Sequence, residues 1–76
     1  MSRAEVSTGL LELKDESTGR HDFWIGETNG KAVTIHFGKV GTPGHRGSRE
    51  FKTAEAARNF LTRRLQQKLE EGYQQV

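Results

Sequence analysis

The residues of this chain best suited to chemistry are cations that follow a short apolar segment. Lys39, Arg46 and Arg49 lie among glycines placed at every third position, and Phe37 and Gly38 come directly before Lys39. Lys and Arg side chains neutralise phosphate, and backbone N–H groups of a glycine-containing loop can add to the same contact. An aromatic ring can stack on a sugar or a base. These five residues are therefore our candidate site for DNA or another polyanion.

Each of these features also has a purely structural interpretation. Phe37 continues the alternation of Val33 and Ile35, so its ring could extend the apolar face into the core. The cations could be solvated charges that prevent an edge strand from pairing with another chain. The glycines could serve tight turns, since a P-loop requires Ser or Thr after Gly-Lys, and Gly38-Lys39 is followed by Val40. The residue pattern alone leaves both interpretations open.

Metal binding and catalysis find little support in the sequence. His21, His36 and His45 could approach one another, and three imidazoles can hold zinc, but the chain has no Cys and no carboxylate is placed beside these histidines. No Ser/His/Asp or paired-carboxylate arrangement can be identified, and so short a chain has little room to shelter one. We expect no metal, no cofactor and no enzymatic activity.

Size and composition describe a small single domain. A chain of 76 residues buries about 60% of its unfolded surface and reaches a stability of about 3–5 kcal/mol. The net charge of +2 permits an anionic partner without requiring one. The first residues lack the apolar core of a signal peptide, and no apolar run is long enough to span a membrane. Together with the absence of Cys, these features lead us to expect a cytoplasmic monomer without a membrane partner.

The N-terminal half is predicted to contain three strands. Residues 1–8 are polar and are expected to form a flexible terminus outside the domain, which then occupies residues 9–76. The segment 10–14 reads as a first strand and is followed by turn residues at 15–19. The second strand is expected at 21–27 and the third at 33–37, where β-branched and aromatic residues are frequent.

Asn29-Gly30 between the second and third strands predicts a type I′ hairpin, which needs positive φ at both central residues. With these two residues as the turn, Trp24 lies opposite Ile35 and Phe23 lies opposite His36. A one-residue slip would exchange the two faces of the sheet. In the predicted register one face carries Trp24, Val33, Ile35 and Phe37, and the other carries Phe23, Ile25, Thr34 and His36.

The C-terminal half is predicted to contain a fourth strand and a long helix. Residues 48–52 alternate, Thr53 is a favourable N-cap, and the helix should run from Ala54 to Glu71. Gly72 supplies the stop, and residues 73–76 could return as a short edge strand. The fold class is α+β, a small antiparallel sheet with one long C-terminal helix packed against it. The apolar stripe of the helix comprises Ala54, Ala57, Phe60, Leu61, Leu65 and Leu69.

The cations of the helix are expected to contribute little to a basic patch. By helical counting, Arg58, Arg63 and Arg64 point in different directions. Lys68 sits near the apolar stripe, so its stem should cover the edge of the core while its charge reaches solvent.

The order of these elements and motifs resembles the WGR domain, over roughly residues 10–76. That family is named for a Trp-Gly-Arg triplet followed by a hydrophobic residue, Gly and Thr; here Phe37-Gly38-Lys39 stands in place of the triplet, before Val40-Gly41-Thr42. Phe can still stack and Lys can still neutralise phosphate, although Lys lacks the bidentate fork of Arg. The remaining motifs that carry the resemblance are Phe23-Trp24, Asn29-Gly30, Pro43-Gly44, Phe51-Lys52-Thr53, Lys68-Leu69 and Gly72-Tyr73.

The resemblance implies a small antiparallel sheet with one helix, and it implies nucleic-acid binding. WGR domains of DNA-dependent poly(ADP-ribose) polymerases help to bind broken DNA, and the domain also occurs in short stand-alone bacterial proteins. We therefore expect a stand-alone module that contacts DNA backbone phosphate with little sequence specificity. The alternative is a protein-interaction module that acts on a partner in trans through the Trp24/Phe37 face or an exposed strand edge. Salt should weaken the first kind of binding steeply and the second only slightly.

Overall fold

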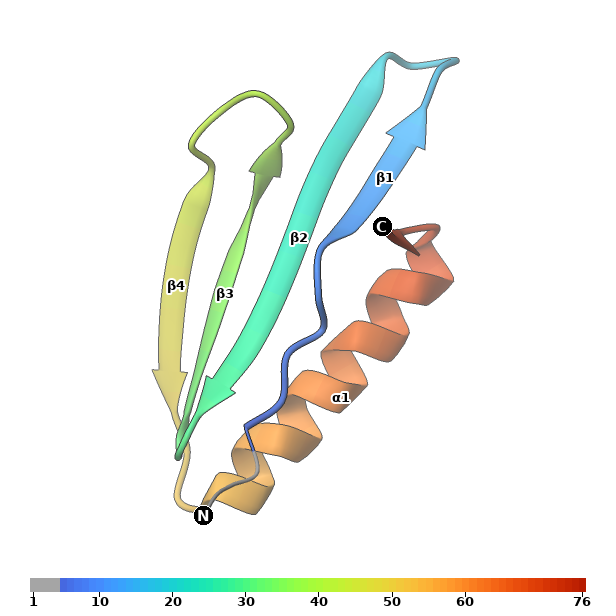
Figure 1. Ribbon diagram of the computed structural model, residues 1–76. Helices are drawn as coiled ribbons and strands as arrows, with labels where there is room; N and C mark the ends of the chain where they lie inside the picture. Colours follow the sequence, from blue (N-terminus) through green and yellow to red (C-terminus); the bar gives the residue numbers. More distant parts are fainter. Residues whose placement is uncertain (1–4) are drawn as a thin grey trace.

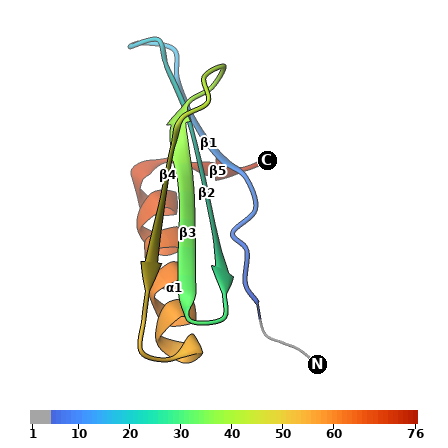
Figure 2. The same ribbon diagram turned by 90° about the vertical axis from the view of Figure 1, so that its left-hand side faces the viewer.

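The computed structural model describes residues 5–76 as one antiparallel sheet with a single helix across one face (Figure 1). The strands are ordered β4-β3-β2-β1-β5, and every pairing between neighbours is antiparallel. Turned by 90°, the sheet is seen nearly edge-on with the helix on one side of it (Figure 2). The expected α+β fold is confirmed. Its elements are β1 (Leu11–Asp15), β2 (Arg20–Asn29), β3 (Ala32–Lys39), β4 (His45–Glu50), α1 (Ala54–Glu71) and β5 (Gln74–Gln75).

The β2–β3 hairpin forms, but the predicted turn type and register are wrong. Asn29 pairs with Ala32, so the two central turn residues are Gly30 and Lys31. Gly30 has a φ of 64°, and no described residue other than glycine has a positive φ, which is the pattern of a type II′ turn. Trp24 consequently lies opposite Phe37 rather than Ile35. The shift amounts to two residues, an even number, so the predicted division of the side chains between the two faces is preserved.

Helix α1 begins and ends where its capping residues predict. The Thr53 hydroxyl oxygen accepts a hydrogen bond from the Ala56 N–H at 3.0 Å, and Gly72 ends the helix with a φ of 112°. Among residues 5–76, no helix is long and apolar enough to cross a membrane. The predicted stripe faces the sheet, except that Leu69 at its end is 39% exposed. The core between helix and sheet consists of Leu11, Trp24, Val33, Ala57, Leu61 and Tyr73.

The N-terminal boundary differs from the expectation. Residues 1–4 lie outside the described residues, but residues 5–8 run along β2 instead of forming a flexible terminus. The Thr8 N–H donates to the Gly26 carbonyl at 2.9 Å, and the Thr28 N–H donates to the Val6 carbonyl at 2.8 Å. Thr8 is only 4% exposed. The polar residues 5–8 are ordered because these hydrogen bonds satisfy their backbone groups where β2 extends past Leu11, the start of β1.

Strand β4 starts three residues earlier than predicted, at His45 rather than Ser48. Gly47 lies inside β4 and pairs with Ile35, and Gly38 lies inside β3. Cross-strand pairing with β3 outweighs the low strand propensity of glycine. The loop therefore spans only residues 40–44, and the cations expected on it belong to the two flanking strands.

Candidate nucleic-acid interface

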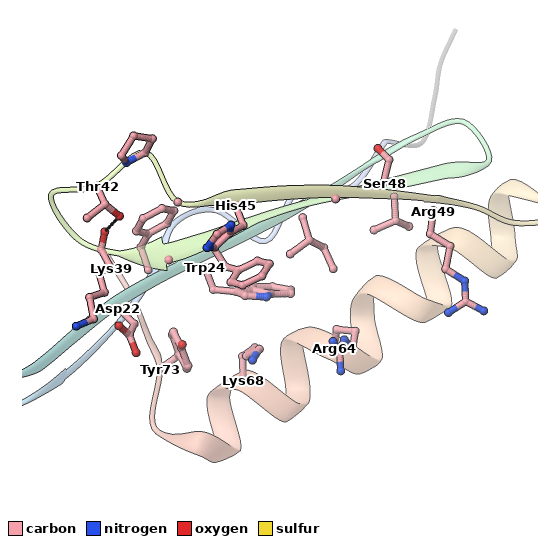
Figure 3. Close-up of a pocket in the computed structure, with 18 of the residues that line it drawn as sticks. Asp22, Trp24, Lys39, Thr42, His45, Ser48, Arg49, Arg64, Lys68 and Tyr73 are labelled. Atoms are coloured by element: carbon pink, nitrogen blue, oxygen red, sulfur yellow. Dashed lines mark hydrogen bonds between the residues drawn. The ribbon is translucent and has the colours of Figure 1, made fainter.

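A cleft of about 990 Å³ lies between α1 and the sheet, along β3 and β4 and the first half of β2 (Figure 3). Aromatic and aliphatic side chains, among them Trp24, Phe37 and Phe60, line it together with an excess of cations. Asp22 is the one carboxylate among the described residues that line the cleft. Such a surface suits an anionic ligand that also carries flat or apolar groups. Its cations are Arg20, Lys39, Arg49, Arg64 and Lys68.

Phe37 belongs to this cleft and not to the core. Its side chain is 43% exposed, whereas Val33 on the same face of β3 is 1% exposed. Helix α1 crosses the sheet at an angle and leaves the end of β3 uncovered (Figure 1). The ring of His45 lies beside Phe37, with 5.7 Å between the ring centroids. The structural interpretation of Phe37 as a core residue is therefore wrong, and its ring is accessible to a ligand.

The glycine segment beside Lys39 is a close-packed turn. Gly44 has a φ of 72°, and a Cβ atom there would lie 2.5 Å from the Phe37 carbonyl oxygen and 2.7 Å from Cζ of Phe23. A Cβ atom on Gly38 would lie 2.6 Å from the Cα atom of Gly44. Only glycine permits this approach, which brings the start of β4 against the end of β3. The two glycines thus shape the strand end that carries Lys39.

Hydrogen bonds hold the loop in place. The Thr42 hydroxyl donates to the Lys39 carbonyl at 2.7 Å, as the dashed line in Figure 3 marks. The Val40 N–H donates to the His21 carbonyl at 2.9 Å. On the other face of the sheet, Nε2 of His36 lies 2.6 Å from the Pro43 carbonyl oxygen, so this nitrogen carries the proton and donates it. Lys39 is therefore presented by an ordered strand end.

Arginines stack on aromatic rings at the β4 side of the cleft. The Arg49 guanidinium carbon lies 4.9 Å from the Phe51 ring centroid and 5.4 Å from that of Phe60. Arg64 approaches the Phe60 ring at 5.8 Å. These are cation–π distances, and they bring a charge on β4 and a charge on α1 to the same side of the molecule. Both arginines remain exposed.

Lys68 approaches the other end of the same cleft. Its ammonium nitrogen lies 5.8 Å from the Trp24 ring centroid and 5.3 Å from that of Tyr73, and its side chain is 18% exposed. Lys68 covers the edge of the core, as expected, beside Trp24 and Tyr73. The expectation that the helix adds little to a basic patch is nevertheless wrong, because Arg64 and Lys68 both line the cleft. The sequence signal was the spacing: Arg64 follows Phe60 by four residues and Lys68 follows Arg64 by four more, and residues four apart share one helix face. A comparison of the three arginines alone does not reveal this shared helix face.

Asp22 neutralises part of the positive charge in the cleft. It forms an ion pair with Arg20, and this hydrogen bond raises the pKa of Arg20 above its ordinary value. Burial raises the pKa of the neighbouring Tyr73 hydroxyl, and the negative charge of Asp22 raises it further. Tyr73 therefore stays neutral near pH 7. Lys68 is also paired, with a Glu71 carboxylate oxygen at 3.5 Å. The positive charge available to a ligand therefore comes mainly from Lys39, Arg49 and Arg64.

Arg46 lies apart from the other four predicted site residues. It pairs with His36, whose side chain projects from the face of the sheet opposite the helix. There it borders a small hollow of about 230 Å³ with Ile25, Glu27 and Thr34. The cleft contains the other four predicted site residues, Phe37, Gly38, Lys39 and Arg49. Arg46 does not line the cleft, and its role in binding stays a prediction.

The three histidines do not converge. His21 lies 3.0 Å from a Glu12 carboxylate oxygen, His36 contacts the Pro43 carbonyl, and His45 stands beside Phe37 on the other face. Within the described residues 5–76, no group of three or more His, Cys, Asp or Glu side chains is placed to hold a metal ion.

Comparisons with known proteins give one family match and one solved structure of similar fold. The family model of the WGR domain matches residues 8–76. A crystal structure of a protein from Bacteroides fragilis, a structural genomics target, superposes with a TM-score of 0.85 at 22% sequence identity. The match covers 93% of this chain and 19% of that protein, so the chain spans about a fifth of its length. A comparison with curated proteins gives no match.

Proposed function

Because the chain belongs to the WGR domain family, a family of nucleic-acid-binding modules, we propose that it binds DNA through backbone phosphate with little sequence readout. The observation that carries this proposal is the cleft, in which four cations beyond the Arg20–Asp22 pair surround exposed aromatic surface. Phosphate contacts supply most of the affinity of nonspecific binding, and base edges are needed only for sequence recognition.

We assign the phosphate contacts first to Lys39 and Arg49. Lys39 ends β3 and Arg49 lies on β4, and both side chains point to the helix side of the sheet, on either side of Phe37. Lys39 and Arg49 lie at opposite ends of the cleft, because Arg49 pairs with Val33, six residues before Lys39 on β3. A nucleic-acid strand whose separate phosphates contact these two cations brings a sugar or base between them within reach of the Phe37 ring. Because Lys makes no bidentate fork, we expect nonspecific affinity in the micromolar range or weaker.

The test compares cations on the two faces of the sheet. Binding of a short duplex with a 5′-phosphate is measured by fluorescence anisotropy at several salt concentrations. The Lys39→Gln/Arg49→Gln variant should bind more weakly, with a salt slope smaller by up to about 2, one for each lost phosphate contact. The control Arg46→Gln removes a charge from β4 on the opposite face and should change the affinity much less.

An NMR titration of the parent with the same duplex locates the contact. Amide shifts should gather at residues 37–39 and 44–49. Parent-like binding by the folded Lys39→Gln/Arg49→Gln variant would place the phosphate site elsewhere. Failure of the parent to bind at low salt would reject the DNA proposal.

A protein partner is the second candidate function, and exposed apolar side chains favour it. Phe37 and Val40 are 43% and 41% exposed at the same strand end. Trp24, which the sequence predicts as part of such a surface, is 3% exposed and cannot contribute much contact area. Binding through Phe37 and Val40 would be nearly insensitive to salt, so the salt series separates the two candidates.

The WGR domain is a binding module and is not catalytic by itself. We propose that this chain likewise carries no enzymatic activity and requires no cofactor. The absence of cysteine from the sequence is compatible with a reducing compartment, and we propose the cytoplasm as its location.

A further inference from the structure

Strand β4 is an edge strand that is exposed along its whole length. It ends the strand order of the sheet, and all six of its residues are exposed. It contains no proline and pairs with β3 in an uninterrupted register, so the common devices that block an edge are missing apart from charge. The opposite edge is the two-residue strand β5, which is too short to attract a partner. No segment of the described residues 5–76 pairs with the outer side of β4.

The orientation of the β4 backbone can be deduced from one hydrogen bond. The Phe51 N–H donates to the Lys31 carbonyl at 2.8 Å. Because backbone groups alternate in direction along a strand, the N–H and C=O groups of Arg46, Ser48 and Glu50 point away from β3. These three residues therefore offer regularly spaced donors and acceptors to a further strand.

We propose that β4 pairs in antiparallel fashion with β4 of a second copy of this chain, with Ser48 opposite Ser48 at the two-fold axis. Arg46 then lies opposite Glu50 of the second copy, and Glu50 lies opposite Arg46 of the second copy. Each of these pairs exchanges both of its main-chain hydrogen bonds, because all the backbone groups concerned point outward. The interface is isologous, as a closed dimer requires.

Charge complementarity selects this register. Arg46 and Glu50 project from the same face of β4, since their partners on β3 are His36 and Ala32, so oppositely charged side chains meet directly across the new pairing. A shift by two residues in one direction would place Arg46 opposite Lys52 of the second copy, which is a like-charged pair. A shift in the other direction would leave Glu50 opposite Gly44 and remove the attraction.

Gly47 gives the second reason for this register. Its cross-strand neighbour in the dimer is Arg49 of the second copy, on the helix side of the sheet. A Cβ atom at Gly47 would meet no atom within 4 Å, so there is open space over this position for the long Arg49 side chain. A larger residue at position 47 would compete for that space.

The dimer would bring two clefts together. A two-fold axis through an antiparallel pairing runs perpendicular to the sheet, so both helices lie on the same side of a continuous sheet. The cleft of each copy reaches β4 through His45, Gly47 and Arg49, and the two clefts would therefore adjoin. The pairing itself does not depend on the DNA proposal and can be tested without nucleic acid.

The test is a charge exchange followed by sedimentation velocity over a range of protein concentrations. The parent should dimerise as concentration rises. Arg46→Glu and Glu50→Arg should each weaken dimerisation by about tenfold or more, because two attractive pairs become repulsive. The double variant Arg46→Glu/Glu50→Arg should restore the parental association. An equimolar mixture of the two single variants should form mixed dimers, since every facing pair is then oppositely charged.

A backbone variant tests the hydrogen bonds separately. Ser48→Pro removes the central outward N–H of β4 without removing a donor to β3, and edge strands accept proline at such positions. This variant should fold, by circular dichroism, and remain monomeric at concentrations where the parent dimerises. A parent that stays monomeric throughout the range would overturn the proposal. The proposal would also be overturned if Ser48→Pro dimerised like the parent. Failure of the double variant Arg46→Glu/Glu50→Arg to regain the parental association would overturn it as well.

Discussion

The ammonium group of Lys68 lies over the ring of Trp24, 5.8 Å from its centroid. Trp24 is the only tryptophan of the chain, and it lies at the bottom of the cleft. The cation therefore stands between a core residue and the ligand that we propose for the cleft. Lys68 therefore contacts both the core and the proposed binding site, and the fluorescence of Trp24 can report changes at this position.

We expect Lys68→Met to weaken DNA binding with little effect on folding. Methionine keeps an unbranched stem over the core. The loss of the cation–π contact and of the exposed ion pair with Glu71 should therefore lower the free energy of unfolding by only about 1 kcal/mol. The salt slope of DNA binding should fall by about 1. Lys14→Met, at an exposed position on the opposite face, serves as the matched control. Equal binding by the two variants would exclude Lys68 from the site.

Leu61→Ala should lower the free energy of unfolding by about 2–5 kcal/mol. Leu61 is completely buried and lies so close to Gly26 that a Cβ atom there would be 2.6 Å from its Cδ1 atom. The loss is comparable with the whole stability of so small a domain. Leu69→Ala, at a 39% exposed position, should cost clearly less in the same thermal or urea melts. Similar losses for both variants would mean that the helix packs through a different stripe.

The helix could be predicted to the residue because its signals are local. Thr53, the apolar stripe and Gly72 act within one turn of the positions that they define. The location of the charged side chains depended instead on long-range pairing. Whether Arg46 faces the cleft or the opposite side follows from the register between β3 and β4, which no local signal fixes.

The same reason explains the missed hairpin register. Asn29-Gly30 is compatible with a turn at either of two positions, and the choice depends on the pairing of whole strands. The exposure of Phe37 depends on the angle at which α1 crosses the sheet, which alternation in the sequence does not encode.

Gly44→Ala should destabilise the domain by about 1–3 kcal/mol. Its φ of 72° is unfavourable for alanine, and the added methyl group would overlap the Phe37 carbonyl and the Phe23 ring. The control is Gly47→Ala, where φ is not positive and nothing lies within 4 Å of the added atom. That change should leave stability unchanged or slightly raised. Chemical denaturation curves of the two variants that coincide would contradict the close packing of the loop.

Stability should fall as pH rises above about 10, because the pKa of Tyr73 is raised in the folded state, chiefly by burial. The unfolded chain then releases its tyrosine proton more readily than the folded one, so alkaline pH favours unfolding. Tyr73→Phe should flatten this part of the stability profile without changing its shape near neutral pH. Urea melts at several alkaline pH values measure the effect. An unchanged alkaline decline in Tyr73→Phe would assign it to other groups.

Restoring the family triplet should strengthen DNA binding if the cleft is used as in other WGR domains. Phe37→Trp enlarges the stacking surface at a side chain that is already 43% exposed, so the indole requires no rearrangement of the core. Lys39→Arg adds a planar fork that can hold phosphate through two hydrogen bonds. The double variant should therefore bind a short duplex several-fold more tightly than the parent at the same salt concentration. Val40→Trp is the control, because it adds an indole to the neighbouring 41% exposed position outside the triplet. A gain no larger than that of Val40→Trp would show that added aromatic surface, and not the triplet geometry, accounts for the change.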